Sequence, residues 1–239
     1  MAFYVVIGGS RGIGGAATQH LVEAGHDIIA VSRTPAQAGK WVEADIGTDD
    51  GLSAVKKAVA LHLGSNPTQK GLDGLLFLGG VWENGAFTDA YDFLASPPGE
   101  TRFLLSVNLT APILLAQLLA SVLAEADNPR VILNGSMSGL PNAATREVAN
   151  TATKFGMQGI TEALNIALRE HGIGVTVVNF ENVATPEVFD DIDQGLFGAQ
   201  VPIPMSDVLA TYNYLLSISA DTVPQSIDLR QKKPEGFNA

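Results

Sequence analysis

Residues 5–14 read Val5-Val6-Ile7-Gly8-Gly9-Ser10-Arg11-Gly12-Ile13-Gly14, an apolar run that leads into glycines and then into a segment with helical spacing. The apolar run predicts a buried strand, and the glycines predict a tight turn at its end. Gly8 permits the turn, Gly12 lets the backbone approach a ligand, and Gly14 permits close packing of the next helix on the strand. Because a helix N-terminus attracts anions, this order predicts a dinucleotide-binding turn. A plain glycine-rich strand-to-helix turn is the alternative.

Short β-rich runs alternate with segments of helical periodicity along the rest of the chain. This alternation predicts a doubly wound α/β fold, in which parallel strands are joined by right-handed crossovers and covered by helices on both faces. We expect a single domain over residues 1–239. The predicted strands are 3–7, 27–31, 72–78, 130–134 and 174–179, and the predicted helices are 13–24, 52–63, 106–124 and 151–171.

Composition narrows the partners that we expect. The 239 residues are 46% hydrophobic and 16% charged, with a formal net charge of −11. This charge disfavours nucleic acid and anionic membranes, which need clustered Lys and Arg, and favours a small-molecule substrate. The absence of cysteine, and of a targeting segment at the first residues, agrees with a cytoplasmic location. The apolar stretch 109–124 is shorter than a membrane span and predicts a buried helix.

The end of the second predicted strand indicates which dinucleotide binds. NAD sites place an Asp or Glu here for the ribose 2′-hydroxyl, whereas a 2′-phosphate needs cations. The chain reads Val31-Ser32-Arg33-Thr34 at this point, and Arg11 lies in the glycine turn. Two guanidinium groups without a carboxylate in the segment predict NADP(H) as cofactor.

With the spacing G-x-x-x-G-x-G, the chain resembles the short-chain dehydrogenase/reductase family, whose motif is usually T-G-x-x-x-G-x-G. Ile7 stands in place of the Thr. The resemblance continues through Asp45-Ile46, where the family contacts adenine, Leu78-Gly79-Gly80 in place of N-A-G, and 182–185, which resembles the segment that holds the nicotinamide carboxamide. It implies a Rossmann-type sheet and a homodimer or homotetramer built on the helices near 109–124 and 151–171. The cofactor-binding residues that it implies, together with the arginines argued above, are Gly8, Ser10, Arg11, Gly12, Ile13, Gly14, Arg33, Asp45, Ile46, Gly79, Gly80, Lys154, Val183 and Thr185.

The catalytic positions of the family are only partly kept. Its members reduce carbonyls with a Ser and a Y-x-x-x-K turn, in which the Tyr donates the proton. The matching turn here runs from Asn150 to Lys154, and Met137 lies on the serine position between two serines. An amide cannot release a proton near neutral pH, so Asn150 cannot act as the general acid. The candidate catalytic residues are Asn108, which matches the family's helix asparagine, Ser136, Ser138, Asn150 and Lys154.

Three functions are compatible with this altered centre. The first is an NADP-dependent oxidoreductase for an enoyl thioester, an iminium or an activated carbonyl, with a surrogate acid such as Glu147 or one of three tyrosines, Tyr91, Tyr212 and Tyr214. The second is a catalytically silent NADP(H)-binding sensor or assembly subunit. The third is non-redox chemistry in the same cleft. We favour the reductase, with residues 187–204 as a lid over an apolar substrate.

Overall fold

A seven-stranded parallel sheet forms the centre of the computed structural model, which describes residues 1–198 and 200–232. The strand order is β3-β2-β1-β4-β5-β6-β7, and each neighbouring pair is parallel. The predicted doubly wound α/β class is therefore confirmed. The order reverses between β1 and β4, which is where such sheets bind ligands. The strands are β1 (Phe3–Ile7), β2 (Asp27–Ser32), β3 (Lys40–Glu43), β4 (Gly74–Phe77), β5 (Arg130–Asn134), β6 (Gly174–Phe180) and β7 (Ser226–Leu229).

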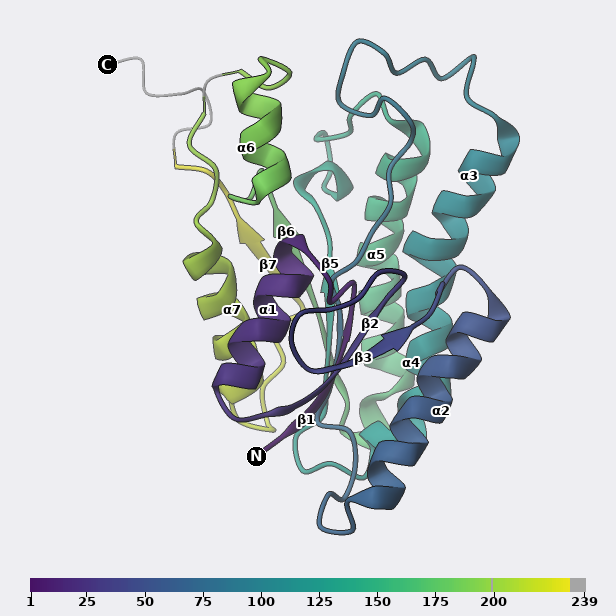
Figure 1. The fold of residues 1–239 in the computed structure, drawn as a ribbon, viewed down its shortest axis with the longest axis vertical. Coiled ribbons are helices and arrows are strands. Elements are labelled where there is room, and N and C mark those ends of the chain that lie inside the picture. The colour runs from purple at the N-terminus through teal and green to yellow at the C-terminus, as the bar shows by residue number, and fades with distance from the viewer. Residues whose placement is uncertain (199, 233–239) are drawn as a thin grey trace.

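Helices cover both faces of the sheet (Figure 1). Helices α1 and α7 lie on one face, and α2, α4 and α5 lie on the other. Helix α6 stands beyond the carboxyl ends of the strands, on the side where a ligand would bind. The helices are α1 (Gly12–Glu23), α2 (Asp49–Ser65), α3 (Pro98–Leu105), the π-helical turn η1 (Ser106–Thr110), α4 (Ala111–Leu123), the 3₁₀ turn η2 (Met137–Gly139), α5 (Val148–Ala167), the 3₁₀ turn η3 (Arg169–His171), α6 (Pro186–Asp193) and α7 (Met205–Ser217).

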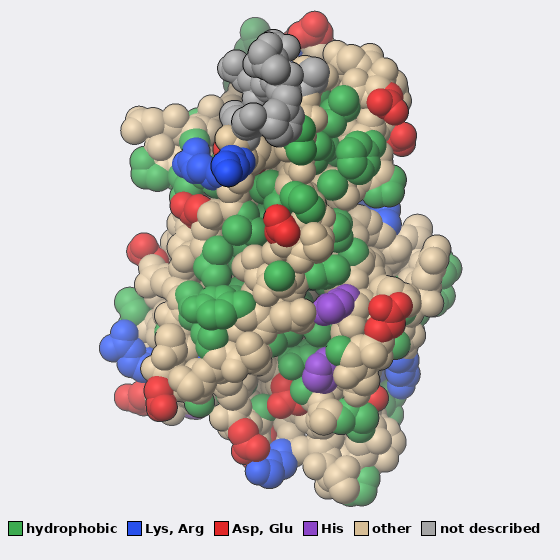
Figure 2. All heavy atoms as spheres, turned by 90° about the vertical axis from the view of Figure 1, so that its left-hand side faces the viewer, with side chains coloured by type: hydrophobic (Ala, Val, Ile, Leu, Met, Phe, Trp, Pro, Cys, Tyr) green, Lys and Arg blue, Asp and Glu red, His purple; other side chains and the backbone are tan. Residues whose placement is uncertain are grey.

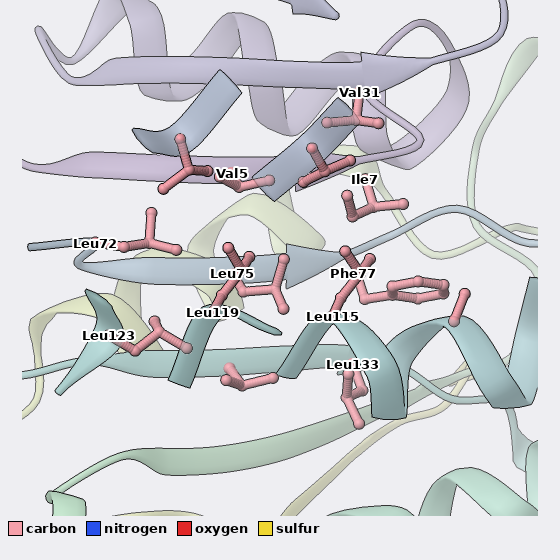
Figure 3. Packing of buried hydrophobic residues seen from close by; sticks show 14 of the residues in the cluster. Val5, Ile7, Val31, Leu72, Leu75, Phe77, Leu115, Leu119, Leu123 and Leu133 are labelled. Carbon is pink, nitrogen blue, oxygen red and sulfur yellow. The ribbon is translucent and has the colours of Figure 1, made fainter. Parts of the chain in front are cut away.

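Successive residues of a strand supply the cores of the two faces in turn. On β1, Val5 and Ile7 pack toward α2, α4 and α5, whereas Tyr4 and Val6 pack toward α1 and α7. Figure 3 shows the first of these cores, in which Leu115 of α4 lies against the β4 side chains. Because all five residues of β1 are buried, the strand reads as a continuous apolar run in the sequence.

The sequence prediction missed the edge strands β3 and β7, the helices α6 and α7, and the first two turns of the long helix that ends at Leu123. The edge strands β3 and β7 were not predicted, because each has only four residues and none of them is buried. Helical structure is continuous over Pro98–Leu123, so the predicted helix 106–124 is about two turns too short at its start. These 26 residues are long and apolar enough to span a membrane, which corrects the length estimate from the sequence. Ala111, Leu115, Leu119 and Leu123 of α4 lie in the core against the sheet, and 44% of the most apolar window of this helix is buried.

A buried arginine joins β5 to the end of α7. Arg130 is 3% exposed, and its guanidinium donates to the carbonyl oxygens of Ser219 at 2.6 Å and Thr222 at 2.7 Å. A third, longer bond of 3.4 Å reaches the carbonyl of Ile218. Desolvation lowers the pKa of Arg130. The arginine thereby satisfies carbonyls at the end of α7 and fixes the chain that leads into β7.

We therefore expect Arg130→Ala to lower the free energy of unfolding by roughly 2–4 kcal/mol, since it removes a buried side chain and its charged hydrogen bonds to the segment after α7. Urea unfolding followed by circular dichroism measures the change. Arg102→Ala, on the exposed side of α3, is the matched control and should change the stability by less than about 0.5 kcal/mol. Equal effects of the two variants would contradict this role of Arg130.

Candidate active site

The glycine turn between β1 and α1 is built on direct backbone contact. Gly8 has φ +84°, and a Cβ at Gly8 would lie 2.5 Å from the Cα of Gly79, which follows β4. A Cβ at Gly14 would overlap the carbonyl oxygen of Gly8. Gly12 has φ +54° with no neighbouring atom within 4 Å of such a Cβ, so it faces open space. The turn therefore leaves its backbone open at Gly12, at the N-terminus of α1, which suits a diphosphate group.

The two predicted phosphate-binding arginines flank this turn. Arg11 is the N-cap residue of α1, with a side chain 77% exposed, and Arg33 is exposed directly after β2. The hydroxyl of Thr34 donates to that of Ser10 at 3.1 Å, which holds the two loops together. In the sheet register, however, Glu43 of β3 lies beside the last residue of β2. The sequence pattern suggested that the end of β2 has no carboxylate. The register corrects this, because Glu43 lies beside it.

The other residues predicted to bind the adenine side and the turn lie at the same edge of the sheet. Asp45 and Ile46 follow β3, where the Asp45 carboxylate accepts a hydrogen bond from the backbone of Gly47 at 3.0 Å and Ile46 packs on the core. Gly79 and Gly80 follow β4. These positions agree with the predicted roles, which stay predictions.

Asn108 lies in η1, between α3 and α4, and both polar atoms of its amide are hydrogen-bonded. Its Oδ1 accepts from the backbone N–H of Val81 at 3.0 Å, and its Nδ2 donates to the Val81 carbonyl at 2.7 Å. The side chain is 2% exposed. Asn108 thus fixes the start of the loop 81–97, and a π-helical turn at this point is a common mark of a functional site.

Lys154 points from α5 to the carboxyl end of β5. It is half-buried, and its Nζ donates to the backbone carbonyl of Asn134 at 3.3 Å. Desolvation lowers the pKa of the ammonium to about 8. The side chain of Asn134 accepts from the buried hydroxyl of Tyr212 at 2.6 Å, and burial raises the pKa of this tyrosine. Tyr212 is therefore held in its neutral, proton-retaining form and is a poor surrogate acid.

The serine segment packs on α5 beside this lysine. Ser136 is the N-cap of η2 and accepts from the Ser138 hydroxyl at 3.0 Å. Gly139 lies so close to the backbone of Lys154 that a Cβ would overlap the Lys154 carbonyl oxygen. Met137, on the serine position of the family, is 8% exposed. The structure therefore packs the serine segment on α5 at Lys154 through Gly139, and the two serine hydroxyls are hydrogen-bonded to each other.

Asn150 is enclosed rather than presented to a cleft. Its side chain is 2% exposed, and its Oδ1 has no hydrogen-bond partner among the described residues. Its backbone N–H donates to Oε1 of the buried Glu83 at 2.9 Å. In the preceding turn, the backbone N–H of Val148 donates to the Tyr91 hydroxyl at 3.2 Å. Glu83 and Tyr91 thus cap α5 from the loop 81–97, and no sequence spacing indicated either contact.

Glu147, considered as a surrogate acid, is the N-cap residue of α5 and is 1% exposed. Its carboxylate accepts from the backbone N–H of Phe87 at 2.9 Å. Burial alone would raise its pKa, but hydrogen bonds to the carboxylate and the nearby Arg146 leave the pKa lowered overall. Glu147 therefore stays ionised near neutral pH and acts as an acceptor that holds the loop.

The predicted lid is partly helical. Thr185 caps α6 by accepting from the backbone N–H of Val188 at 3.4 Å, and Val183 pairs with Ile203 in an isolated bridge that closes the base of the segment. The first turn of α6 lies beside the glycine turn, where a carboxylate oxygen of Glu187 is 3.7 Å from a guanidinium nitrogen of Arg11. Residue 199 of the predicted lid 187–204, and residues 233–239 of the predicted domain, lie outside the described residues.

The lowered pKa of Lys154 predicts a specific pH dependence of stability. Between about pH 8 and pH 10.5, the unfolded chain holds a proton on this side chain that the folded chain has released, so the free energy of unfolding rises with pH. Lys154→Met should remove this rise in urea unfolding measured across the window. Lys56→Met, on the exposed side of α2, should keep it. Parallel curves for the chain and for Lys154→Met would show that Lys154 is not desolvated.

Comparison with known proteins agrees with this arrangement. The family model for short chain dehydrogenases matches residues 2–194. The chain is 28% identical over 183 residues to an L-xylulose reductase from Bos taurus, covering 76% of this chain and 72% of that protein. Its fold is similar to a metagenomic short-chain oxidoreductase in complex with NADP, with a TM-score of 0.75, 22% identity and 97% of each chain covered.

A second solved structure binds the other nicotinamide cofactor. The 3-alpha-hydroxysteroid dehydrogenase from Pseudomonas sp. B-0831, complexed with NADH, has a TM-score of 0.76 at 19% identity, covering 96% of this chain and 95% of that one. At these identities the structural likenesses concern the fold alone. The match of the family model over most of the chain, together with the glycine turn and the switch-point sheet, shows that the chain belongs to the short-chain dehydrogenase family of oxidoreductases.

Proposed function

We propose that this chain is an NADP(H)-dependent oxidoreductase that acts on a small or hydrophobic carbonyl, enoyl or imine substrate. The observation that carries the proposal is the glycine turn, where Gly8 and Gly14 allow backbone to contact backbone and Gly12 faces open space at the N-terminus of α1, flanked by Arg11 and Arg33. The two arginines favour NADP(H), because a 2′-phosphate needs cations. The carboxylate of Glu43, beside the end of β2, would repel this phosphate.

Lys154 is the residue best suited to the chemistry. A bound nicotinamide supplies or accepts a hydride. Lys154 would hold the adjoining ribose, and its ammonium, with a pKa of about 8, would donate a hydrogen bond or a proton to the developing charge on a substrate oxygen or nitrogen. Asn150 cannot give a proton, and its side chain is enclosed. A substrate that is already activated, such as an iminium or an enoyl thioester, suits this centre better than a simple ketone.

A catalytically silent NADP(H)-binding protein is the second candidate. It is favoured by the burial of Asn150 and Met137, which fill the two positions where the family has its tyrosine and serine. Non-redox chemistry in the same cleft has no specific support.

The segment 187–204 is proposed as the lid over this cleft. Phe189 is 49% exposed and Leu196 is 45% exposed, so apolar side chains of the segment are available to a substrate. The pair formed by Glu187 and Arg11 ties the segment to the phosphate side of the cleft. Such a lid would exclude water from a hydrophobic substrate.

A homodimer or homotetramer, in the cytoplasm, is also proposed. Exposed hydrophobic side chains lie along α3, α4 and α5, namely Phe103, Ile113, Phe155 and Ile166. Figure 2 shows further hydrophobic side chains on the α1 and α7 side of the molecule, where Tyr214 is 50% exposed. Two apolar surfaces on opposite sides of the sheet suit assembly about two axes.

For the cofactor, we expect Arg33→Asp to weaken NADPH binding by about tenfold to a hundredfold, and NADH binding much less, because the variant removes a cation from the 2′-phosphate. Glu43→Gln should shift the preference in the opposite direction, toward NADPH. Calorimetric titration of each variant with both nucleotides measures the effects, and Arg102→Asp controls for general charge. Equal losses for both nucleotides in Arg33→Asp would contradict the arginine clamp.

For the reaction, we expect the unchanged chain to oxidise NADPH with enoyl thioesters or cyclic imines and to be slow with ketones. Restoring the family residues in the double variant Asn150→Tyr, Met137→Ser should raise ketone reduction by roughly 10²-fold or more, since it restores positioned acid catalysis. Loss of reduced-cofactor absorbance follows the reaction. If NADPH binds but every substrate panel is silent, the protein is the sensor rather than the reductase.

A further inference from the structure

Asn134, the last residue of β5, joins the two faces of the sheet at its carboxyl edge. Along β5, Val131 and Leu133 pack in the core with α4 and α5, whereas Ile132 packs in the core on the other face, with α7. Because side chains alternate along a strand, the Asn134 side chain belongs to the same face as Ile132. Its contacts agree, since its amide meets α7 while its backbone carbonyl meets α5.

Three hydrogen bonds converge on this one residue. The Tyr212 hydroxyl of α7 donates to Oδ1 at 2.6 Å, and Nδ2 donates at 3.5 Å to the carbonyl of Leu78, which follows β4. The backbone carbonyl accepts from Nζ of Lys154 at 3.3 Å. Asn134 is 7% exposed, so its amide has little access to water that could replace the first two bonds. The segment after β4, the lysine of α5 and the tyrosine of α7 therefore share one point of attachment.

Tyr212 is the member of this group that packing fixes most firmly. It is 2% exposed and packs edge-on against Phe180 of β6, with the ring centroids 6.4 Å apart, in a core that also contains Val208 and Leu215. A buried ring of this size cannot move without opening a void or overlapping its neighbours, so packing sets the position of its hydroxyl. Removing that hydroxyl would leave Oδ1 of Asn134 without this donor.

Lys154, by contrast, has few contacts that hold its charged end. Within residues 1–198 and 200–232, the Asn134 carbonyl is the one acceptor to which Nζ donates. Desolvation lowers the pKa of the ammonium, without a contribution from a charged group among the described residues. A single carbonyl therefore has a large share in stabilising the charged form of this lysine. A small movement at the end of β5 would change both the position and the pKa of the ammonium.

We propose that Tyr212 is a positioning residue for Lys154. From the face of the sheet opposite to α5, its hydroxyl holds the Asn134 amide, and Asn134 in turn presents its backbone carbonyl to Nζ (Figure 1). Burial raises the pKa of the Tyr212 hydroxyl, so it acts by donating one fixed hydrogen bond rather than by releasing a proton. The proposal rests on the proposed function in that Lys154 is the residue that serves the reaction. The alternative is a core tyrosine that only satisfies a buried amide.

The test follows the Lys154 ammonium directly. NMR titration of the whole protein with isotope-labelled lysine, assigned with Lys154→Met, gives the pH midpoint of this side chain. Tyr212→Phe removes one hydroxyl and keeps the ring. We expect it to lower the midpoint by about half a pH unit or more, because a freed Asn134 amide loosens the carbonyl that stabilises the ammonium. Tyr214→Phe, at an exposed position of the same helix, is the matched control and should leave the midpoint unchanged.

A double variant tests the path through Asn134. Asn134→Ala removes the amide that carries the effect, so adding Tyr212→Phe to Asn134→Ala should cause no further change in the midpoint. A lower melting temperature with an unchanged midpoint in Tyr212→Phe would overturn the proposal, since a purely structural role predicts that result. So would a fall in the double variant, relative to Asn134→Ala, as large as the fall in Tyr212→Phe alone. The titration needs neither cofactor nor substrate, so silence in the substrate panels would refute the proposed reaction without deciding this test.

Discussion

The direct backbone contact between glycines at the end of β1 is the constraint on which the rest of the site depends. Gly8, Gly14 and Gly79 come so close that a single methyl group at Gly8 or Gly14 would overlap a neighbouring backbone atom. This closeness brings the first turn of α1 directly over the switch between β1 and β4. The N–H groups of that turn consequently face the space in which a phosphate can lie. Side chains at Gly8 or Gly14 would push the helix away from the strand.

The parallel sheet carries this local constraint to the whole cleft. Because parallel strands end at one edge, the segments after β1, β2, β3, β4, β5 and β6 all reach the same side of the molecule, although they come from distant parts of the chain. Loops alone would not hold that arrangement. Asn108 fixes the segment after β4 through both polar atoms of its amide, and the packing of Gly139 on Lys154 fixes the segment after β5.

How far the sequence predicts this structure depends on the kind of interaction involved. Strands such as 130–134 are buried on both faces and therefore read as apolar runs, so their bounds were predicted closely. The edge strand Ser226–Leu229 alternates exposed and half-buried residues over only four positions, which is too short a pattern to recognise. The contacts of Glu83 and Tyr91 with α5 were beyond prediction, because they join an aperiodic loop to backbone N–H groups that any residue would offer. Likewise, only the register of β3 revealed that Glu43 lies beside β2.

The charge of Lys154 is the strongest physical reason to expect that the cleft binds a ligand. The ammonium is desolvated, yet it donates only to one long carbonyl contact and has no ion-pair partner within residues 1–198 and 200–232. A half-buried cation that has lost part of its water and has no carboxylate partner costs folding free energy. In the family, the lysine acts together with a Tyr and a Ser. Asn150 and Met137 stand at those positions here, yet Lys154 is present. A ligand that offers oxygen atoms to Nζ, such as a ribose or a substrate carbonyl, offsets the cost only while it is bound, so the lysine is better explained by binding than by folding.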